Sequence, residues 1–245
     1  MLTRSFCCFR GISVQAEQKL WRSGCLDWRM LSYGAGALSL RRQQNLLAQL
    51  PEMQAALQAG LAEYFLARLP VGHRLRVWPE FDGNTLFLDI ETSGLGRDAK
   101  ITVIGAYLNG QFHQYVLGRN LEQFLDLLAG AKLLVTFNGK CFDWPFIERH
   151  FGVSLSVPHI DLMYEFRAPG YTGGLKKIEQ HLGLHRNEVE AGDGMMAVIL
   201  WQQYAQDGST AALDRLLEYN RRDVTSLVDL SRILLQRSIQ NFPGP

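Results

Sequence analysis

The sequence predicts an α/β fold in which helices flank a mixed β-sheet, with a small helical N-terminal region in front of it. Residues 1–69 have apolar residues at helical spacing and almost no strand signal. From Thr85 onward, short apolar runs that suit buried strands alternate with amphipathic helical runs. The pair Asn109-Gly110 separates two strand-like runs, which is typical of a β-hairpin and therefore indicates an antiparallel pair within the sheet.

Length and composition allow one sizeable core plus an appendage, because the chain has 245 residues of which 47% are apolar and 20% charged. It has no apolar run of 18 residues, so we expect no membrane span, and its N-terminus is too poor in apolar residues for a secretory signal. The net charge of +1 does not decide for or against nucleic acid, since a sum hides opposite charges in different places.

The cysteines indicate a cytoplasmic protein with reduced thiols, because they form no CxxC pair and nothing else points to export. They are Cys7, Cys8, Cys25 and Cys141.

The N-terminal region, 1–69, is expected to contain helices at 43–50 and 51–69, with Pro51 in the first turn of the second one. The following segment, 70–84, is rich in turn-forming residues and reads as a linker or edge segment.

The third region, 85–236, begins with the strand TLFLDIE and continues with the hairpin around Asn109-Gly110. KLLVTF forms a second core strand, and SVPHIDLM contains a short one. Three strands, a helix, a strand and further helices predict a mixed sheet with an antiparallel hairpin. The expected helices are at 121–128, 144–151, 174–182, 194–206 and 210–236, and a C-terminal tail follows at 237–245.

The first acidic motif is FLDIETSGL, in which Asp89 and Glu91 are two residues apart on the first strand. Side chains alternate along a strand, so both carboxylates point to one face while Ile90 enters the core. Two carboxylates at the end of an apolar strand cost free energy unless something compensates, and a bound cation is the simplest compensation. The alternative is two solvated acids at a strand end.

The second motif is VTFNGKCFDWP, in which a buried strand runs into a loop and then a helix. Asp143 reads as the N-cap of that helix, with Pro145 in its first turn, and Asn138-Gly139 reads as a turn. An aspartate in a first turn can still face the mouth of the adjacent strand, so the N-cap reading is compatible with a site.

The third motif is YNRRD, in which Tyr219 and Asp223 are four residues apart on a helix and therefore share one face. Asp223 lies beside the apolar stripe of this helix and should be partly buried, so it needs a partner. That partner is either Arg221, Arg222 or another basic residue in a salt bridge, or a cation held jointly with the other acids.

These residues together resemble the DEDD exonuclease superfamily in its tyrosine-bearing subgroup, whose fold is ribonuclease H-like. The match runs over 85–235 and fills all five signature positions. These are Asp89, Glu91, Asp143, Tyr219 and Asp223. A narrower resemblance is to the YprB-type ribonuclease H-like proteins, predicted exonucleases of bacteria. It rests on GGLKKIEQHLGL at 173–184, DGMMAVILWQQY at 193–204, LLEYNRRDV at 216–224 and FRGISVQAEQKLWRSGCLDW at 9–28.

The resemblance implies a site for two Mg²⁺ ions, with Mn²⁺ a possible substitute. Asp89, Glu91 and Asp223 would hold one ion, Asp89 would bridge to the second, and Asp143 would support the second directly or through water. Tyr219 would orient the attacking water.

The candidate substrate-binding residues surround this site. The loop after the first strand would approach the terminal nucleotide, and Gly94 permits close backbone contact. Gly173-Gly174 precedes a helix whose start can hold a phosphate, unless it is only a loop before a solvated helix face. The candidates are Thr92, Gly94, Leu95, Asn138, Lys176, Lys177 and Arg222.

The expected activity is therefore a metal-dependent 3′–5′ exonuclease acting on DNA or RNA. Two alternatives stay open: a non-catalytic ribonuclease H-like module that binds nucleic acid or a protein partner, and a structure-selective endonuclease on the same fold. The sequence does not distinguish DNA from RNA, and it does not indicate a protein partner.

Overall fold

The computed structural model describes residues 1–34, 38–96, 98–184 and 194–240 and divides the chain into two units. The first unit comprises Met1–Asp82 and Ile233–Pro245, and the second comprises Gly83–Arg232. No described helix combines the length and the hydropathy needed to cross a lipid bilayer.

A five-stranded mixed sheet forms the centre of the second unit, in the order β3-β2-β1-β4-β5. The pairs β3–β2 and β2–β1 are antiparallel, whereas β1–β4 and β4–β5 are parallel, which confirms the predicted mixed sheet. The hairpin turns at Asn109 and Gly110, both with positive φ as a type I′ turn requires. The strands are β1 Thr85–Thr92, β2 Ile101–Leu108, β3 Gln111–Val116, β4 Leu133–Thr136 and β5 His159–Asp161.

The helices of the second unit lie close to the predicted ranges, with one addition. A short helix, α7, follows β5 directly, and the sequence analysis did not predict it. The last helix extends to Ile239, into the segment expected as a tail, and residues 241–245 lie outside the described residues. The helices are η6 Leu121–Gln123, α5 Phe124–Ala129, α6 Asp143–Phe151, α7 Leu162–Arg167, α8 Leu175–His181, α9 Gly194–Asp207 and α10 Thr210–Ile239, and α10 continues beyond Arg232 into the first unit.

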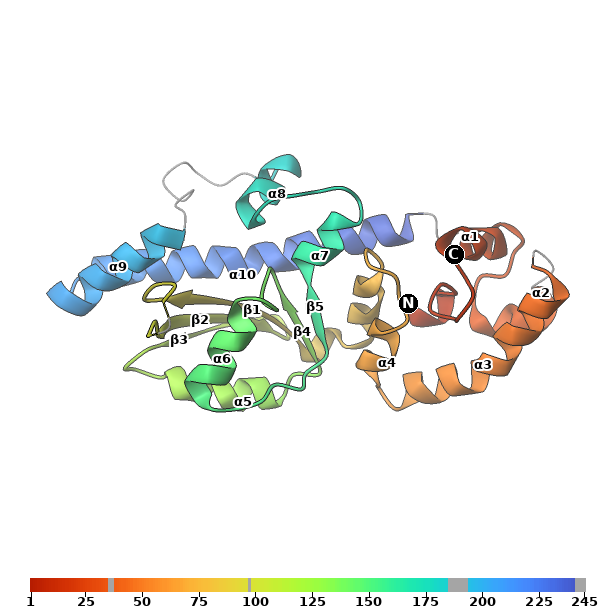
Figure 1. The fold of residues 1–245 in the computed structure, drawn as a ribbon, viewed down its shortest axis with the longest axis horizontal. Coiled ribbons are helices and arrows are strands. Elements are labelled where there is room, and N and C mark those ends of the chain that lie inside the picture. Colours follow the sequence, from red (N-terminus) through yellow and green to blue (C-terminus); the bar gives the residue numbers. More distant parts are fainter. Residues whose placement is uncertain (35–37, 97, 185–193, 241–245) are drawn as a thin grey trace. The chain divides into compact units, whose positions relative to one another are not determined.

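Helices cover both faces of this sheet, as Figure 1 shows, with α5 and α6 on one side and α9 and α10 on the other. Leu88 and Ile104 contribute to an apolar cluster with α5 and α6. Val103 packs with Ala197 of α9 and Leu216 of α10 on the opposite face. The alternation of side chains along β2 thus builds two separate cores, one on each side of the sheet.

The N-terminal unit is helical, as predicted. One correction concerns Pro51, which lies in the interior of α3 rather than in the first turn of a new helix. A proline there leaves the carbonyl of Leu47 without its helical N–H donor, and Leu47 is 40% exposed, so water can reach this part of the helix. The elements are η1 Leu2–Arg4, α1 Val14–Arg22, η2 Trp28–Met30, α2 Leu31–Gly34, α3 Leu40–Gln58, α4 Ala62–Leu66, η4 Arg74–Glu80 and η5 Asp82–Asn84.

The segment read as a linker or edge segment, 70–84, is packed and largely helical. Leu75, Arg76, Val77 and Trp78 of η4 are all buried. Its proline and glycine residues are real turn signals, but the apolar side chains between them join the core of the N-terminal unit. The four cysteines are free thiols, and only Cys141 is exposed.

Candidate metal centre

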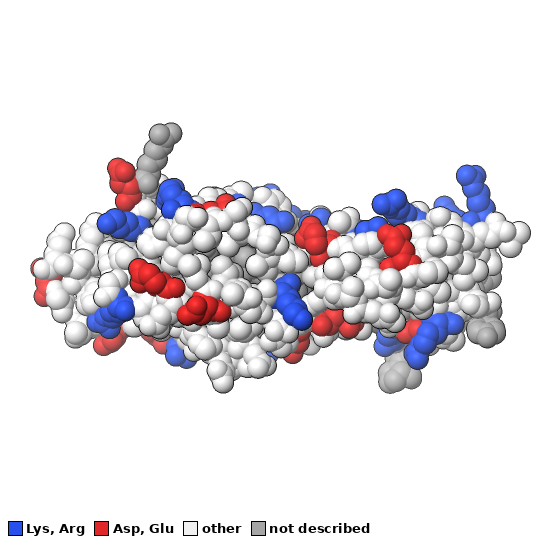
Figure 2. Space-filling model, turned by 90° about the horizontal axis from the view of Figure 1, so that it is seen from below, with Lys and Arg blue, Asp and Glu red and all other residues white. Residues whose placement is uncertain are grey.

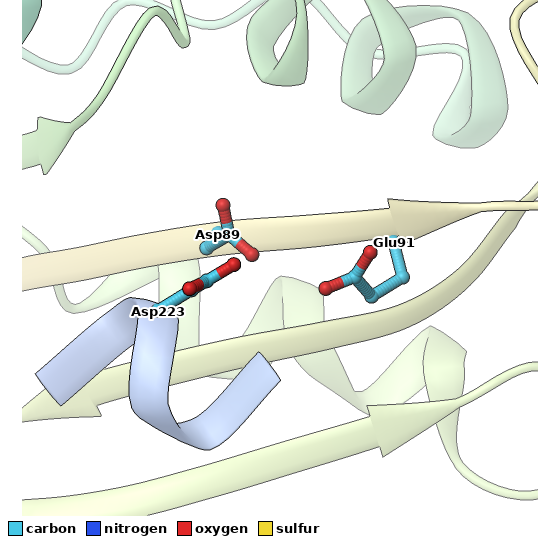
Figure 3. A group of neighbouring side chains, drawn as sticks. All are labelled: Asp89, Glu91 and Asp223. Atoms are coloured by element: carbon cyan, nitrogen blue, oxygen red, sulfur yellow. The ribbon is translucent and has the colours of Figure 1, made fainter. Parts of the chain in front are cut away.

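Three carboxylates from two elements converge on one point of the second unit. Asp89 and Glu91 project from the same face of β1, as strand alternation predicts, and Asp223 projects toward them from α10 (Figure 3). One carboxylate oxygen of each residue lies within 4.8 Å of the other two. This spacing allows all three residues to contact a single cation.

Asp143 lies beside this group at the start of α6. The N-cap of α6 is Phe142, so the reading of Asp143 as the N-cap is wrong by one position. Asp143 is buried, and its Oδ1 accepts a hydrogen bond from the backbone N–H of Ile90 at 3.1 Å. That bond ties the carboxylate of Asp143 to the backbone of β1 at Ile90, the residue between Asp89 and Glu91 in the sequence.

A glycine in β2 lets α10 approach the sheet closely enough to bring Asp223 to Asp89. Gly105 pairs with Asp89 in the antiparallel register. A Cβ atom on Gly105 would lie 2.1 Å from Oδ1 of Asn220 and 2.9 Å from Cγ2 of Val224. Any larger residue would therefore push α10 away from the strand that carries the acids.

Asn220 ties α10 to β1 at the same place. Its Nδ2 donates hydrogen bonds to the backbone oxygen of Asp89 at 3.2 Å and to Oδ2 of Asp89 at 3.1 Å. Sequence reasoning missed both Asn220 and Gly105. The only available signal was a glycine in the middle of an apolar strand, which often marks a close approach of another backbone.

Tyr219 sits one helical turn before Asp223 and contacts Lys176 of α8. The ammonium of Lys176 donates to the phenol oxygen of Tyr219 at 2.8 Å and lies 4.5 Å from the centre of its ring. The neighbouring Lys177 is exposed on the same helix. The two lysines therefore differ in their surroundings although they are adjacent in the sequence.

The acidic cluster strongly favours protonated carboxyls in the absence of a cation. Burial, and then the neighbouring carboxylates, raise the pKa values of Asp89 and Glu91 well above their usual range, although the Asn220 hydrogen bond opposes this. Burial raises the pKa of Asp143 to about 7. A bound cation would relieve the repulsion among these neighbouring carboxylates.

The donor set fits a hard divalent cation. Oε1 of Glu91 is buried and has no hydrogen-bond partner among the described residues, so one oxygen is available for a ligand. All converging donors are carboxylate oxygens, the ligands that Mg²⁺ and Mn²⁺ prefer. The two histidines of this unit with lowered pKa values, His150 and His159, do not join the group.

The carboxylates open into a cavity of about 630 Å³, which also has an apolar side. Of the candidate substrate-binding residues, Thr92, Gly94, Leu95 and Asn138 line this cavity. A smaller cavity of about 400 Å³ shares Asp89, Tyr219 and Asp223 with it, and Lys176 and Lys177 line this second space. The apolar side of the larger cavity is formed by Ile90, Leu95, Phe137, Phe142, Met195 and Val198.

The arginines of the third motif have contacts away from both cavities. Nε of Arg222 forms an ion pair with Oε1 of Glu218 at 2.8 Å, one turn earlier in α10. The guanidinium of Arg221 lies 4.3 Å from the ring centre of Phe112. Of the seven candidate substrate-binding residues, Arg222 is the one that lines neither cavity.

Asp161, which sequence reasoning also missed, holds the loop between β4 and α6. Its carboxylate accepts hydrogen bonds from the backbone N–H groups of Asn138 at 2.8 Å and Lys140 at 3.1 Å. Asn138 adopts a positive φ of 62°, so the turn reading of Asn138-Gly139 is confirmed. The loop that leads to Asp143 is thereby fixed from β5.

Comparisons with known proteins agree with this geometry. The model of the RNase H superfamily matches residues 86–235. The uncharacterized protein YprB of Bacillus subtilis (strain 168) is 29% identical over 175 residues, which cover 60% of this chain and 41% of that protein. The match thus spans about two fifths of this relative's length, and the predicted resemblance to YprB-type ribonuclease H-like proteins is confirmed.

A solved structure shares the fold. The family B DNA polymerase from the hyperthermophilic archaeon Pyrobaculum calidifontis superposes with a TM-score of 0.51 at 17% sequence identity. The match covers 65% of this chain and 26% of the polymerase chain. At this identity the likeness establishes the fold alone, and it agrees with the mixed sheet flanked by helices.

Proposed function

The chain belongs to the RNase H superfamily, and from this premise we propose that it is a metal-dependent 3′–5′ exonuclease that hydrolyses phosphodiester bonds of DNA or RNA. The observation that carries the proposal is the convergence of Asp89, Glu91 and Asp223 at a cavity lined by Asp143 and Tyr219 as well. Acids with no role beyond the protein surface would stay solvated by water and would not be buried against one another at such a cost in free energy.

The four carboxylates would together bind two divalent cations. Asp89, Glu91 and Asp223 would hold one ion, and Asp89 with Asp143 would support a second, with Mg²⁺ as the default and Mn²⁺ as a substitute. Two such ions supply activation of a water molecule and stabilisation of the leaving oxyanion at phosphorus. The scaffold fixes Asp89 by the Asn220 hydrogen bond and Asp143 by the Ile90 hydrogen bond, so these two acids need little rearrangement on binding.

Tyr219 would orient the attacking water. Its phenol oxygen accepts a hydrogen bond from the ammonium of Lys176, so toward a water beside the acids the phenol O–H would act as the donor. Lys176 thereby fixes the rotation of the hydroxyl, and its positive charge partly offsets the negative charge of Glu91. The pKa of an ordinary tyrosine is about 10, so orientation of the water, rather than removal of its proton, is the role that suits a tyrosine at neutral pH.

The walls of the two cavities suit a nucleotide at a strand end. The apolar side of the larger cavity offers a surface against which a base can pack, and Leu95 is 82% exposed at its edge. Gly94 allows the backbone of this loop to approach the nucleotide. Lys176 and Lys177 in the adjoining cavity would bring positive charge to the phosphate side. Asn138 in the larger cavity is a further candidate for substrate contact, whereas Arg222 would contact only substrate that extends beyond both cavities.

The test is a cleavage panel of end-labelled single-stranded, duplex and both-ends-blocked DNA and RNA, with Mg²⁺, Mn²⁺ or EDTA. We expect stepwise shortening from free 3′ ends only when a divalent ion is present. Asp89→Ala and Asp223→Asn should lower the rate by about 10³-fold or more, since metal stabilisation of the transition state is worth several kcal/mol. Asp229→Asn is the matched control, because Asp229 lies on the same helix in an exposed pair with Arg232.

Each alternative has its own outcome in this panel. Cleavage of substrates with both ends blocked would replace the exonuclease by an endonuclease. Absence of cleavage on every substrate, together with no heat of Mg²⁺ or Mn²⁺ binding by calorimetry, would favour a non-catalytic module. Equal rates for the parent chain and Asp223→Asn would remove the acidic cluster from the reaction.

A further inference from the structure

The two units carry opposite net charges. The first unit has eleven Lys and Arg residues and six Asp and Glu residues, whereas the second has fourteen and eighteen. The net charges are therefore +5 and −4, although the whole chain is close to neutral. The negative unit contains the candidate metal centre, so the positive charge on the other unit needs a separate explanation.

The positive charge comes from residues 1–51, which contain seven basic and only two acidic residues. Both acids are occupied inside the unit. Glu17 is fully buried and pairs with Arg76 at 2.8 Å, and Asp27 accepts hydrogen bonds from the backbone and the side chain of Arg29. The charge that this segment presents to solvent is therefore almost all positive.

Three of these basic residues lie along one side of α3. The backbone N–H of Arg10 donates to Oε1 of Gln49 at 2.9 Å, and its carbonyl oxygen accepts from Nδ2 of Asn45 at 3.0 Å. Arg41 and Arg42 precede Asn45 and Gln49 by one and two helical turns, so they lie on the same side of α3. Arg10, Arg41 and Arg42, here termed the arginine surface, are all exposed, and none has an ion-pair partner among the described residues.

The position of two of these arginines does not serve the stability of α3. They occupy the first turn of a 19-residue helix, which contains no acidic residue there, and Ser39 makes no side-chain capping bond. Positive side chains near a helix N-terminus are unfavourable because the exposed N–H groups are themselves partly positive. Such an arrangement becomes favourable when an anion lies against it.

We propose that the arginine surface binds the phosphate backbone of a nucleic acid, at a site separate from the candidate metal centre. Guanidinium groups match phosphate oxygens in two-point hydrogen bonds, and a strand presents phosphates at regular spacing. The choice of a nucleic acid over other polyanions rests on the proposed function. Figure 2 shows one face of the molecule, on which charges of both signs are scattered over a mostly uncharged surface.

The experiment measures binding alone, so that it does not depend on cleavage. Fluorescence anisotropy of a labelled single-stranded DNA of about thirty nucleotides is titrated with the full chain in EDTA at several salt concentrations. The triple variant Arg10→Gln, Arg41→Gln, Arg42→Gln should bind about tenfold more weakly at low salt. The slope of log K against log salt should become less steep by about 2, since each lost phosphate contact on a single strand contributes about 0.7.

A matched triple variant removes the same charge elsewhere. Arg29→Gln, Arg215→Gln and Arg232→Gln leave the arginine surface intact and should change the slope by less than about 0.5. An equal change in both triple variants would mean that only net charge matters, and it would overturn the proposal. Unchanged slope and affinity in the first triple variant would overturn it as well, provided circular dichroism shows both variants folded.

Vesicles of phosphatidylserine and phosphatidylcholine test the other anionic surface in the same assay. Binding to these vesicles that the first triple variant loses, without binding to DNA or RNA, would replace the nucleic acid by a membrane. If the chain cleaves nothing but shows the expected salt slopes, the arginine surface stands while the proposed nuclease activity fails. If it cleaves while the first triple variant binds like the parent chain, the opposite holds.

Discussion

Each unit of this protein buries a glutamate, Glu17 on α1 and Glu91 on β1, and the two glutamates have opposite surroundings. Glu17 in the N-terminal unit accepts hydrogen bonds from the backbone N–H groups of Phe6 at 2.6 Å and Cys7 at 2.9 Å, and pairs with Arg76 at 2.8 Å. Glu91 in the second unit faces Asp89 and Asp223, and its Oε1 has no hydrogen-bond partner among the described residues.

The difference separates a carboxylate that is compensated inside its own unit from one that belongs to the candidate metal centre. Glu17 is compensated by the protein itself, through two backbone N–H groups and the guanidinium of Arg76. The acids around Glu91 raise one another's pKa values, so this part of the second unit is under electrostatic strain until a cation binds. A buried carboxylate oxygen that no donor reaches is thus a better indicator of a ligand site than burial alone.

The largest expected effect is on stability and has opposite signs in the two units. Glu17→Gln removes the charge opposite Arg76 and should lower the free energy of unfolding of the N-terminal unit by about 3–5 kcal/mol, as for other broken buried pairs. Glu91→Gln removes a carboxyl whose ionisation is costly at this place, and it should leave the second unit as stable or more stable in EDTA. Urea denaturation with hydrogen exchange resolves the two units.

An exposed pair gives the control for that measurement. Arg29→Gln breaks the pair with Asp27, whose arginine side chain is 84% exposed, and should change the free energy of unfolding by less than about 1 kcal/mol. Should Glu91→Gln in EDTA prove as destabilising as Glu17→Gln, the two glutamates would have the same structural role and the contrast would disappear.

A smaller effect is expected from pH in the absence of metal. The pKa of Asp143 rises from its ordinary 3.8 to about 7 on folding, so the folded chain keeps this proton where the unfolded chain has lost it. Stability of the second unit should therefore fall as pH rises from about 4 to about 7, and the raised pKa values of Asp89 and Glu91 act in the same direction.

Thermal melting at several pH values tests this linkage. In EDTA the melting temperature should drop by several degrees between about pH 4.5 and 7.5, in the range that a few kcal/mol produces for a chain of this size. Mn²⁺ should reverse the drop, most strongly at the higher pH, because ligands must lose their protons to bind metal. A melting temperature that is independent of both pH and Mn²⁺ would contradict the raised pKa values.

The parts of the site that follow from local periodicity could be predicted from the sequence. Strand alternation places Asp89 and Glu91 on one face, and helical spacing places Tyr219 one turn before Asp223. The hairpin at Asn109 and the order of strands and helices depend on equally local signals, and the sheet confirms them.

Contacts that depend on the packing of distant elements could not be predicted. The approach of α10 to β2 is set by Gly105, and only the folded chain shows that Asn220 fills the space this glycine leaves. The local rule that a proline starts a helix fails at Pro51, because packing of the residues on both sides keeps α3 continuous across it. Lys176 has the same local sequence context as Lys177, and tertiary structure alone distinguishes them.

The smallest expected effect concerns Lys176. It shows whether a positive charge near the acids contributes to the reaction rate. Lys176→Met removes both the donor and the charge that contact Tyr219, so it should lower kcat by roughly tenfold to a hundredfold while leaving Mn²⁺ affinity nearly unchanged. Tyr219→Phe should have a similar effect, and the double variant should be no slower than the worse single variant, because the two groups act through one hydrogen bond.

Lys132→Met, at the opposite end of β4 from the loop that leads to Asp143, is the matched control and should match the parent chain in a single-turnover assay. Additive losses in the double variant would instead show that Lys176 contacts the substrate independently, which would put positive charge at the metal centre itself rather than only on the N-terminal unit.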